Sequence, residues 1–218
     1  MTTKPQVQQK HTGQIGFTII ELMISTVVFS MVLLLLTTAI INFTKSYYKG
    51  ITEVNTQHVA RSITEDITQT IQLNGANYTN VDPAGVWQGF CFGDEAYVYK
   101  LGQQLADGAL NPSKQHQTNQ ALLKGNVPGG CAGIANAASL AASLSSPKEM
   151  LSPSMRLADI QIAQLSNGLY SLLVNVAYGD DDLLSNPTGP TPSCKGLSGS
   201  QFCAISGLST VVLKRVQQ

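Results

Sequence analysis

The sequence predicts an α+β protein in which one long N-terminal helix, with a transmembrane first half, packs on an antiparallel β-sheet head. First, no charged residue occurs from Leu22 to Thr44. Second, apolar residues then recur every three to five positions as far as Ile71, with no intervening proline. Third, the alternation of apolar and polar residues from Tyr170 to Tyr178 is typical of a half-buried strand. A helix followed by a run of strands favours the α+β class.

The uncharged run has about the 20 residues that a helix needs to cross a hydrocarbon core. A short polar leader that carries Lys4, Lys10 and His11 precedes it. The positive-inside rule then places the N-terminus in the cytoplasm and the rest of the chain outside. We therefore expect a single-pass protein of the cytoplasmic (inner) membrane with an extracytoplasmic head.

A lone carboxylate, Glu21, stands where the chain enters this apolar run. A carboxylate inside a membrane costs roughly 3 kcal/mol and is normally kept only with a partner. A conventional secretory signal cleaved after Thr37-Thr38-Ala39, or an uncleaved signal anchor, accounts for the apolar run but not for Glu21. A glutamate that merely extends to the lipid headgroups is the simplest alternative.

The stretch GQIGFTIIELMISTVVFSMVLLLL resembles the class III signal of type IV pilins and type II secretion pseudopilins. In that family a membrane aspartyl peptidase cuts after the glycine and N-methylates the new first residue. The resemblance implies cleavage between Gly16 and Phe17 and N-methylation of Phe17. Residues 1–16 are then a leader peptide, residues 17–44 the transmembrane and polymerisation helix, and residues 45–75 its amphipathic continuation before the head at 76–218.

The resemblance also gives Glu21 a role. Cleavage creates an amine at Phe17, one helical turn from Glu21, and the carboxylate can pair with that amine or with the amine of a neighbouring subunit. Since a paired charge is tolerable in low dielectric, the family's assignment of this glutamate to filament assembly carries over to Glu21. The implied partners are other pilin-like subunits, the prepilin peptidase, the assembly platform of the cytoplasmic membrane, and membrane lipid.

Beyond the membrane, the helix should continue to about Leu73, with Asn74-Gly75 as its stop and Gly50 as the place for a bend. Arg61, Glu65 and Asp66 are interpreted as a solvated face. The apolar stripe expected to pack on the head comprises Ile51, Val54, Val59, Ile63, Ile67 and Ile71.

The head is expected to be an antiparallel meander. VWQGFCF and AYVYKL are strand candidates separated by the turn at 93–95, and RLADIQIAQL and LYSLLVNVAYG flank a hairpin turn at 166–168. A last strand is expected from Leu208 to Val216. Residues 102–156 are rich in small and polar residues and predict loops, with a weak helical patch at IANAASLAASL.

Four cysteines, Cys91, Cys131, Cys194 and Cys203, lie on the exported side. An even count in an oxidising compartment predicts two disulfides, although sequence alone permits three connectivities. The resemblance implies a C-terminal loop closed by Cys194 and Cys203, which leaves Cys91 to pair with Cys131. Metal binding is the poorer interpretation because no CxxC pair occurs.

One acidic cluster, Asp180-Asp181-Asp182, follows the best strand candidate. Carboxylates at a turn can ligate Ca²⁺, but the spacing lacks alternating ligands, so a solvated turn is the favoured interpretation and these residues are weak calcium candidates.

Composition and motifs argue for a structural function. A net charge of zero and only 12% charged residues leave a nucleic-acid partner, and with it a role in DNA uptake, without support. No HExxH, GxSxG or phosphate-binding loop occurs, so neither an enzyme nor a cofactor is expected. By resemblance, most closely to minor pilins and pseudopilins of the J and W kinds, the chain is a subunit of a surface filament or pseudopilus or of its tip and initiation complex. The alternative is a non-polymerising, membrane-anchored binding or sensor domain.

Overall fold

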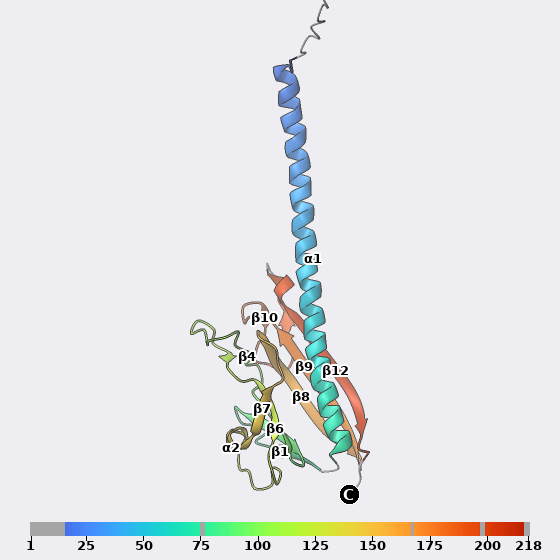
Figure 1. Ribbon diagram of the computed structural model, residues 1–218, viewed down its shortest axis with the longest axis vertical. Helices are drawn as coiled ribbons and strands as arrows, with labels where there is room; N and C mark the ends of the chain where they lie inside the picture. The colour runs from blue at the N-terminus through green and yellow to red at the C-terminus, as the bar shows by residue number, and fades with distance from the viewer. Residues whose placement is uncertain (1–15, 75–76, 167, 197–198, 216–218) are drawn as a thin grey trace, which may run out of the picture. The chain divides into compact units, whose positions relative to one another are not determined.

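The computed structural model describes residues 16–74, 77–166, 168–196 and 199–215 (Figure 1). The protein is α+β, as the sequence predicts, and the chain divides into two compact units, Met1–Thr44 and Lys45–Gln218. One helix, α1 (Ile19–Leu73), contributes to both units, and its bounds agree with the expected helix to within two residues. The other elements are β1 (Tyr78–Val81), β2 (Gln88–Phe92), β3 (Glu95–Tyr99), β4 (Gln104–Leu105), β5 (Gln117–Thr118), β6 (Leu122–Asn126), α2 (Ala137–Ser143), β7 (Ser145–Glu149), β8 (Met155–Ser166), β9 (Leu169–Tyr178), β10 (Leu184–Ser185), β11 (Ser193–Cys194), the 3-10 helix η1 (Ser200–Phe202) and β12 (Ala204–Leu213).

In the first unit, the described part of α1 is long and apolar enough to cross a membrane, and its side chains are exposed. Five of its hydroxyl side chains, those of Thr26, Ser30, Thr37, Thr38 and Thr44, donate to carbonyls three or four residues earlier in the same helix. Thr26 donates to the carbonyl of Met23, and Ser30 to that of Thr26. These hydroxyl groups are therefore satisfied within the helix, as a membrane favours.

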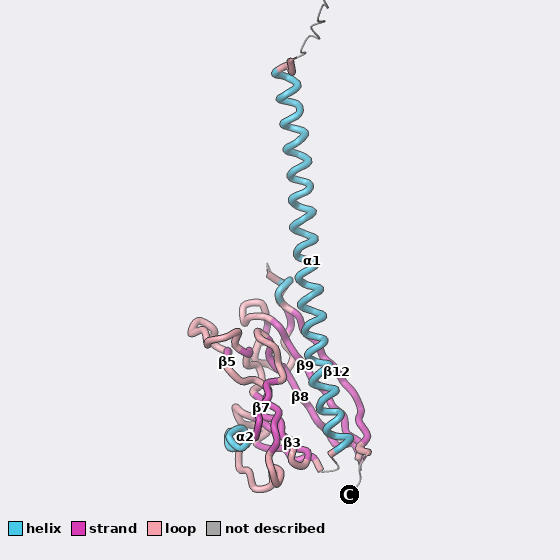
Figure 2. Tube along the Cα trace, viewed as in Figure 1, coloured by secondary structure: helices cyan, strands magenta, loops and turns pink. Residues whose placement is uncertain are grey.

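The second unit contains two five-stranded sheets and a two-stranded ribbon rather than one meander (Figure 2). The first sheet has the order β1-β2-β3-β6-β7 and the second the order β12-β9-β8-β4-β5, while β10 and β11 form the ribbon. Among the strands that the structure describes, all pairings are antiparallel except the short pairing of β4 with β5. The sequence pattern did not reveal the second sheet, because only tertiary contact decides which strands pair.

The main core lies between the end of α1 and the two sheets. Ile63, Ile67 and Ile71 are at most 2% exposed and pack against both sheets. On β9, the predicted alternation is confirmed from Tyr170 to Val176, where every second side chain is buried, but it breaks at the end of the strand, where Ala177 is buried and Tyr178 only partly so. Burying one such isoleucine contributes roughly 2 kcal/mol, so this cluster anchors the helix to the head.

The prediction of an apolar stripe that packs on the head is wrong for its first residues. Ile51 and Val54 are exposed, and the buried face of α1 there comprises Thr52, Thr56 and Ala60. These short side chains permit close packing, and the hydroxyl of Thr56 donates to the carbonyl of Thr52 at 2.7 Å, so its burial leaves no unsatisfied donor. Gly50 lies within the continuous helix rather than at a break.

A second core covers the other face of the first sheet. Leu140 of α2 is fully buried there with Val98 of β3 and Leu123 of β6. The weak helical patch is thus a short helix, but four strands, β4, β5, β6 and β7, lie in the region expected to be loops. β6 contains Lys124 and Gly125, which obscure its strand pattern, and it forms because β3 and β7 flank it.

The remaining strand predictions differ in their bounds. β2 and β3 flank a turn at Gly93 and Asp94, close to the expected one, and β8 and β9 form the expected hairpin, although its central residue, Asn167, lies outside the described residues. β12 begins at Ala204, four residues before the expected start, because it pairs with β9 along its whole length. The expected end of that strand, and Gly75 of the expected helix stop, also lie outside the described residues.

Candidate functional site

The start of α1 is a closed hydrogen-bonded turn. Thr18 directly precedes the helix, and its Oγ1 accepts from the backbone N–H of Glu21 at 3.3 Å. In return, the Glu21 carboxylate accepts from the backbone N–H of Thr18 at 3.0 Å and from its hydroxyl at 2.9 Å. This reciprocal arrangement is a capping box, in which a threonine and a glutamate three residues later satisfy donors that a helix start leaves unpaired.

The capping box gives Glu21 a partner within the intact chain, which the sequence interpretation missed. The signal was present, because Thr18-Ile19-Ile20-Glu21 fits the pattern of threonine and glutamate three residues apart before an apolar run. Gly16 and Phe17 lie before the helix in exposed, non-helical backbone. Cleavage, methylation and filament assembly at these positions stay predictions.

The acidic turn after β9 is ion-paired rather than a freely solvated turn. Asp180 lies 2.7 Å from Lys114 Nζ and also accepts from the side chain of Gln104. Asp181 lies 2.7 Å from Arg156 and 2.9 Å from His116 Nδ1. The two carboxylates thus connect β4 and the loop between β4 and β5 to the start of β8.

These contacts set the ionisation of both carboxylates. Partial burial alone would raise the pKa of Asp181, but the hydrogen bonds from Arg156 and His116, together with their charges, hold that pKa below its ordinary value. Burial is likewise outweighed at Asp180, whose pKa is lowered by Lys114 and Gln104. Lys114, Arg156 and His116 occupy oxygens of these carboxylates with donors that do not ligate Ca²⁺, so the calcium interpretation is not supported there.

Arg156 of β8 is the centre of this cluster and was not singled out from the sequence. Its side chain is fully buried and donates to the carbonyls of Gly102, Gly179 and Pro187 as well as to Asp181. A buried guanidinium with these partners fixes three loops at one end of the sheet. An arginine at the start of a strand carries no sequence signal for this role, since its partners come from distant loops.

A second polar cluster joins α1 to the first sheet. Asp66 accepts from the hydroxyl of Tyr97 at 2.7 Å and lies 3.0 Å from Lys124 Nζ, so its assignment to a solvated face is wrong. Arg61 and Glu65 do form an exposed pair, as expected. Burial raises the pKa of the Tyr97 hydroxyl, which therefore stays protonated and donates.

An open polar pocket of about 320 Å³ lies beside this cluster, lined by Thr70, Asn74, Glu95 and Lys124 among others. Its charged groups already have partners, because Lys124 is within 3.5 Å of Glu95 as well as bonded to Asp66. Among the residues that the structure describes, no group of histidine, cysteine and carboxylate side chains converges to hold a metal ion.

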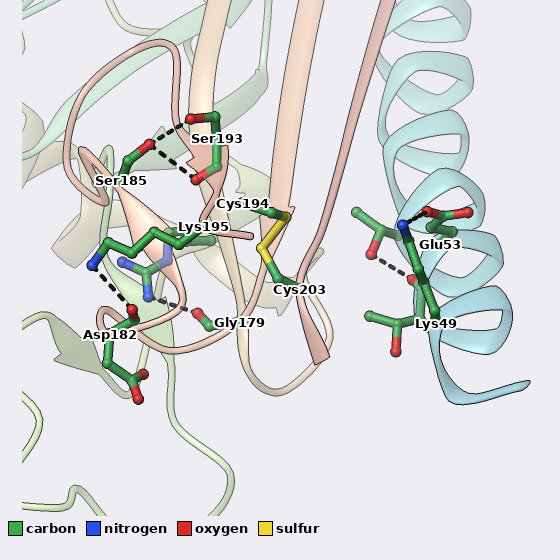
Figure 3. Close-up of a disulfide and its surroundings, with 12 residues drawn as sticks. Lys49, Glu53, Gly179, Asp182, Ser185, Ser193, Cys194, Lys195 and Cys203 are labelled. Atoms are coloured by element: carbon green, nitrogen blue, oxygen red, sulfur yellow. Dashed lines mark hydrogen bonds and ion pairs between the residues drawn. A yellow bond between two sulfur atoms is a disulfide. The ribbon is translucent and has the colours of Figure 1, made fainter. Parts of the chain in front are cut away.

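Two disulfides, Cys91–Cys131 and Cys194–Cys203, link the four cysteines. The first is buried in the second core, behind the first sheet. The second ties β11 to the residue before β12, and Figure 3 shows Lys195 beside it, donating to the carbonyl of Asp182. Each disulfide fixes a segment with little regular structure of its own.

The long apolar helix and the antiparallel sheets are compatible with a pilin-like architecture. No family model, curated protein or solved structure matches this chain.

Proposed function

We propose that this chain is a pilin-like structural subunit that joins a filament through its N-terminal helix after its leader is removed. The observation that carries the proposal is the position of Glu21 in the first turn of a helix whose following residues, as far as Thr44, carry no charge. The capping box satisfies this side chain within one chain, but a glutamine would serve there without the free-energy cost of a charge in a membrane, so the charge itself needs a reason. Assembly of subunits supplies that reason.

In the proposed mechanism, the prepilin peptidase cuts between Gly16 and Phe17 and leaves a cationic amine on Phe17. Glu21 of one subunit then pairs with this amine, on its own chain or on a neighbouring one, as the apolar helices associate. Because an unpaired charge is unfavourable in low dielectric, the pair selects one axial offset between subunits. The exposed apolar surface of α1 supplies the remaining contact area.

The same apolar helix supports a proposal for where the protein is located. Before assembly it is a single-pass protein of the inner membrane with its head outside, and afterwards it belongs to a surface filament or pseudopilus. The resemblance favours a minor pilin or pseudopilin, a component of the filament or of its tip and initiation complex. Its partners are other pilin-like subunits and the assembly platform.

The test is the intact mass and N-terminal sequence of the membrane-extracted protein from cells with and without the prepilin peptidase. A mature chain that begins at N-methylated Phe17 only when the peptidase is present supports the proposal. A chain that begins at Met1 or after Ala39 in both strains overturns it. Glu21→Leu then separates anchoring from assembly, because a mere anchor tolerates this change whereas a filament subunit loses incorporation.

A further inference from the structure

We propose that the Thr18–Glu21 capping box fixes the start of α1 so that the Gly16–Phe17 bond stays outside the helix and open to the peptidase. This inference rests on the proposed function, since it concerns the same cleavage. It assigns a positioning role to Thr18. Glu21 then has two roles, as a hydrogen-bond acceptor in the capping box before cleavage and as the charged partner of an amine after cleavage.

The hydrogen bonds at the start of α1 support the positioning role. The Leu22 N–H donates to the carbonyl of Thr18 at 3.2 Å, which is the backbone bond of a helix that starts at Ile19. The N–H of Glu21, which a longer helix would bond to the carbonyl of Phe17, instead donates to Thr18 Oγ1. The capping box thus occupies a donor that would otherwise extend the helix toward Gly16.

Loss of the capping box should extend the helix toward the N-terminus. In an apolar environment the freed N–H of Glu21 cannot rely on water, so the carbonyl of Phe17, one turn earlier, becomes its best acceptor. The same winding would bond the N–H of Ile20 to the carbonyl of Gly16, four residues earlier. That carbonyl belongs to the bond that the peptidase must hydrolyse.

Hydrolysis explains why a free carbonyl matters. An aspartyl peptidase directs water at the Gly16 carbonyl carbon while protonating its oxygen, and the C–N bond to Phe17 then breaks. The water oxygen stays on the new Gly16 carboxylate, and the proton is delivered to the departing Phe17 amine. A carbonyl that already accepts a helical hydrogen bond and lies within a helix is poorly placed for both steps.

Three single variants of the full-length chain test the proposal in cells that express the peptidase, with the rate of leader removal measured by pulse-chase. Thr18→Val removes the hydroxyl and keeps the branched shape, whereas Thr18→Ser keeps the hydroxyl. Glu21→Gln keeps an acceptor that a capping box accepts but removes the charge. Membrane fractionation of each variant checks that the chain is inserted.

We expect Thr18→Val to slow cleavage roughly fivefold, the change in equilibrium that loss of such a cap produces. Thr18→Ser and Glu21→Gln should be cleaved at the rate of the unaltered chain, although Glu21→Gln should then fail to assemble. Amide hydrogen exchange in micelles provides the structural readout, because the Ile20 N–H should gain protection in Thr18→Val. A residue that merely contacts the peptidase would not change that protection.

Cleavage of Thr18→Val at the unaltered rate overturns the capping inference and leaves the proposed function intact. Slow cleavage without any gain of protection at Ile20 overturns it too, since Thr18 would then act by contact. If the unaltered chain is not cleaved at all, the proposed function itself is overturned, and this inference with it.

Discussion

The guanidinium of Arg156 is fully buried and lies 2.7 Å from the carboxylate of Asp181. Asp180, the preceding residue, makes a pair of the same length with Lys114, but its side chain is 46% exposed. Adjacent residues with the same side chain thus pair with a fully buried cation in one case and with a partly exposed cation in the other, which gives a matched comparison of their effects on stability.

Asp181→Asn should therefore destabilise the protein far more than Asp180→Asn. The first change leaves a buried cation without its counter-ion and should cost about 3 kcal/mol, whereas the second breaks an exposed pair and should cost about 1 kcal/mol or less. Chemical unfolding of the full chain in detergent measures both. Equal losses would show that Arg156 is held by its three backbone acceptors rather than by Asp181.

The same carboxylate makes stability depend on acid. The folded pKa of Asp181 lies below its ordinary value of 3.8, so below that pH the unfolded chain binds protons that the folded chain does not. The contribution of Asp181 to the free energy of unfolding should be complete above pH 3.8 and should be lost as pH falls through the folded pKa. Comparing the pH dependence of the unaltered chain with that of Asp181→Asn checks this, and the variant should show a shallower decline.

Thr70→Val should lower the free energy of unfolding more than Thr64→Val does, although both residues are buried in α1. The hydroxyl of Thr70 lies 2.8 Å from that of Tyr97, across the interface between helix and sheet, whereas Thr64 donates to the carbonyl of Ala60 in its own helix. Loss of the first bond should cost roughly 1 to 2 kcal/mol, and loss of the second should have a much smaller effect.

A double-mutant cycle of Thr70→Val with Tyr97→Phe is the control for this comparison. It should give a coupling energy, because both changes remove the same hydrogen bond. Additive effects would mean that Thr70 contributes only by packing.

The two disulfides should differ in stabilisation and in exposure to reductant. Cys91 and Cys131 are 40 residues apart, and Cys194 and Cys203 are 9 apart, so loop entropy predicts losses of roughly 4 and 2.5 kcal/mol when each pair is replaced by alanine. Cys194 lies on an exposed strand, whereas Cys91 and Cys131 are buried. Mild reductant followed by thiol labelling and mass spectrometry should therefore find Cys194 and Cys203 labelled first.

Gly102→Ala should destabilise the protein much more than Gly108→Ala does. Both glycines have positive φ angles, of 70° and 91°, which strain any other residue. A methyl group at Gly102 would also lie 2.5 Å from the Cα of Thr188, whereas nothing lies within 4 Å of the corresponding position at Gly108.

We therefore expect a loss of about 1 kcal/mol for Gly108→Ala, from backbone strain alone, and a loss of more than about 2 kcal/mol for Gly102→Ala. Thermal unfolding monitored by circular dichroism measures both. Similar losses would show that the backbone at Thr188 moves aside freely.

Short-range patterns in the sequence determined the helix and the best hairpin. The bounds of α1 follow from apolar spacing and the absence of proline, and the alternation along β9 follows from one buried sheet face. These features were predictable because each depends on residues that are neighbours in the chain. The capping box at Thr18 and Glu21 was equally local, and attention to helix-start patterns would have found it.

Only the tertiary structure decided the other features, because these features depend on contacts between residues that are distant in the chain. β6, with its lysine and glycine, is a strand only because β3 and β7 supply its hydrogen bonds. Arg156 becomes a buried anchor only when Gly179 and Asp181 come to it from beyond the next strand. In the same way, Ile51 is exposed while Thr52 is buried, since the surface that packs against a helix decides which of its faces is covered.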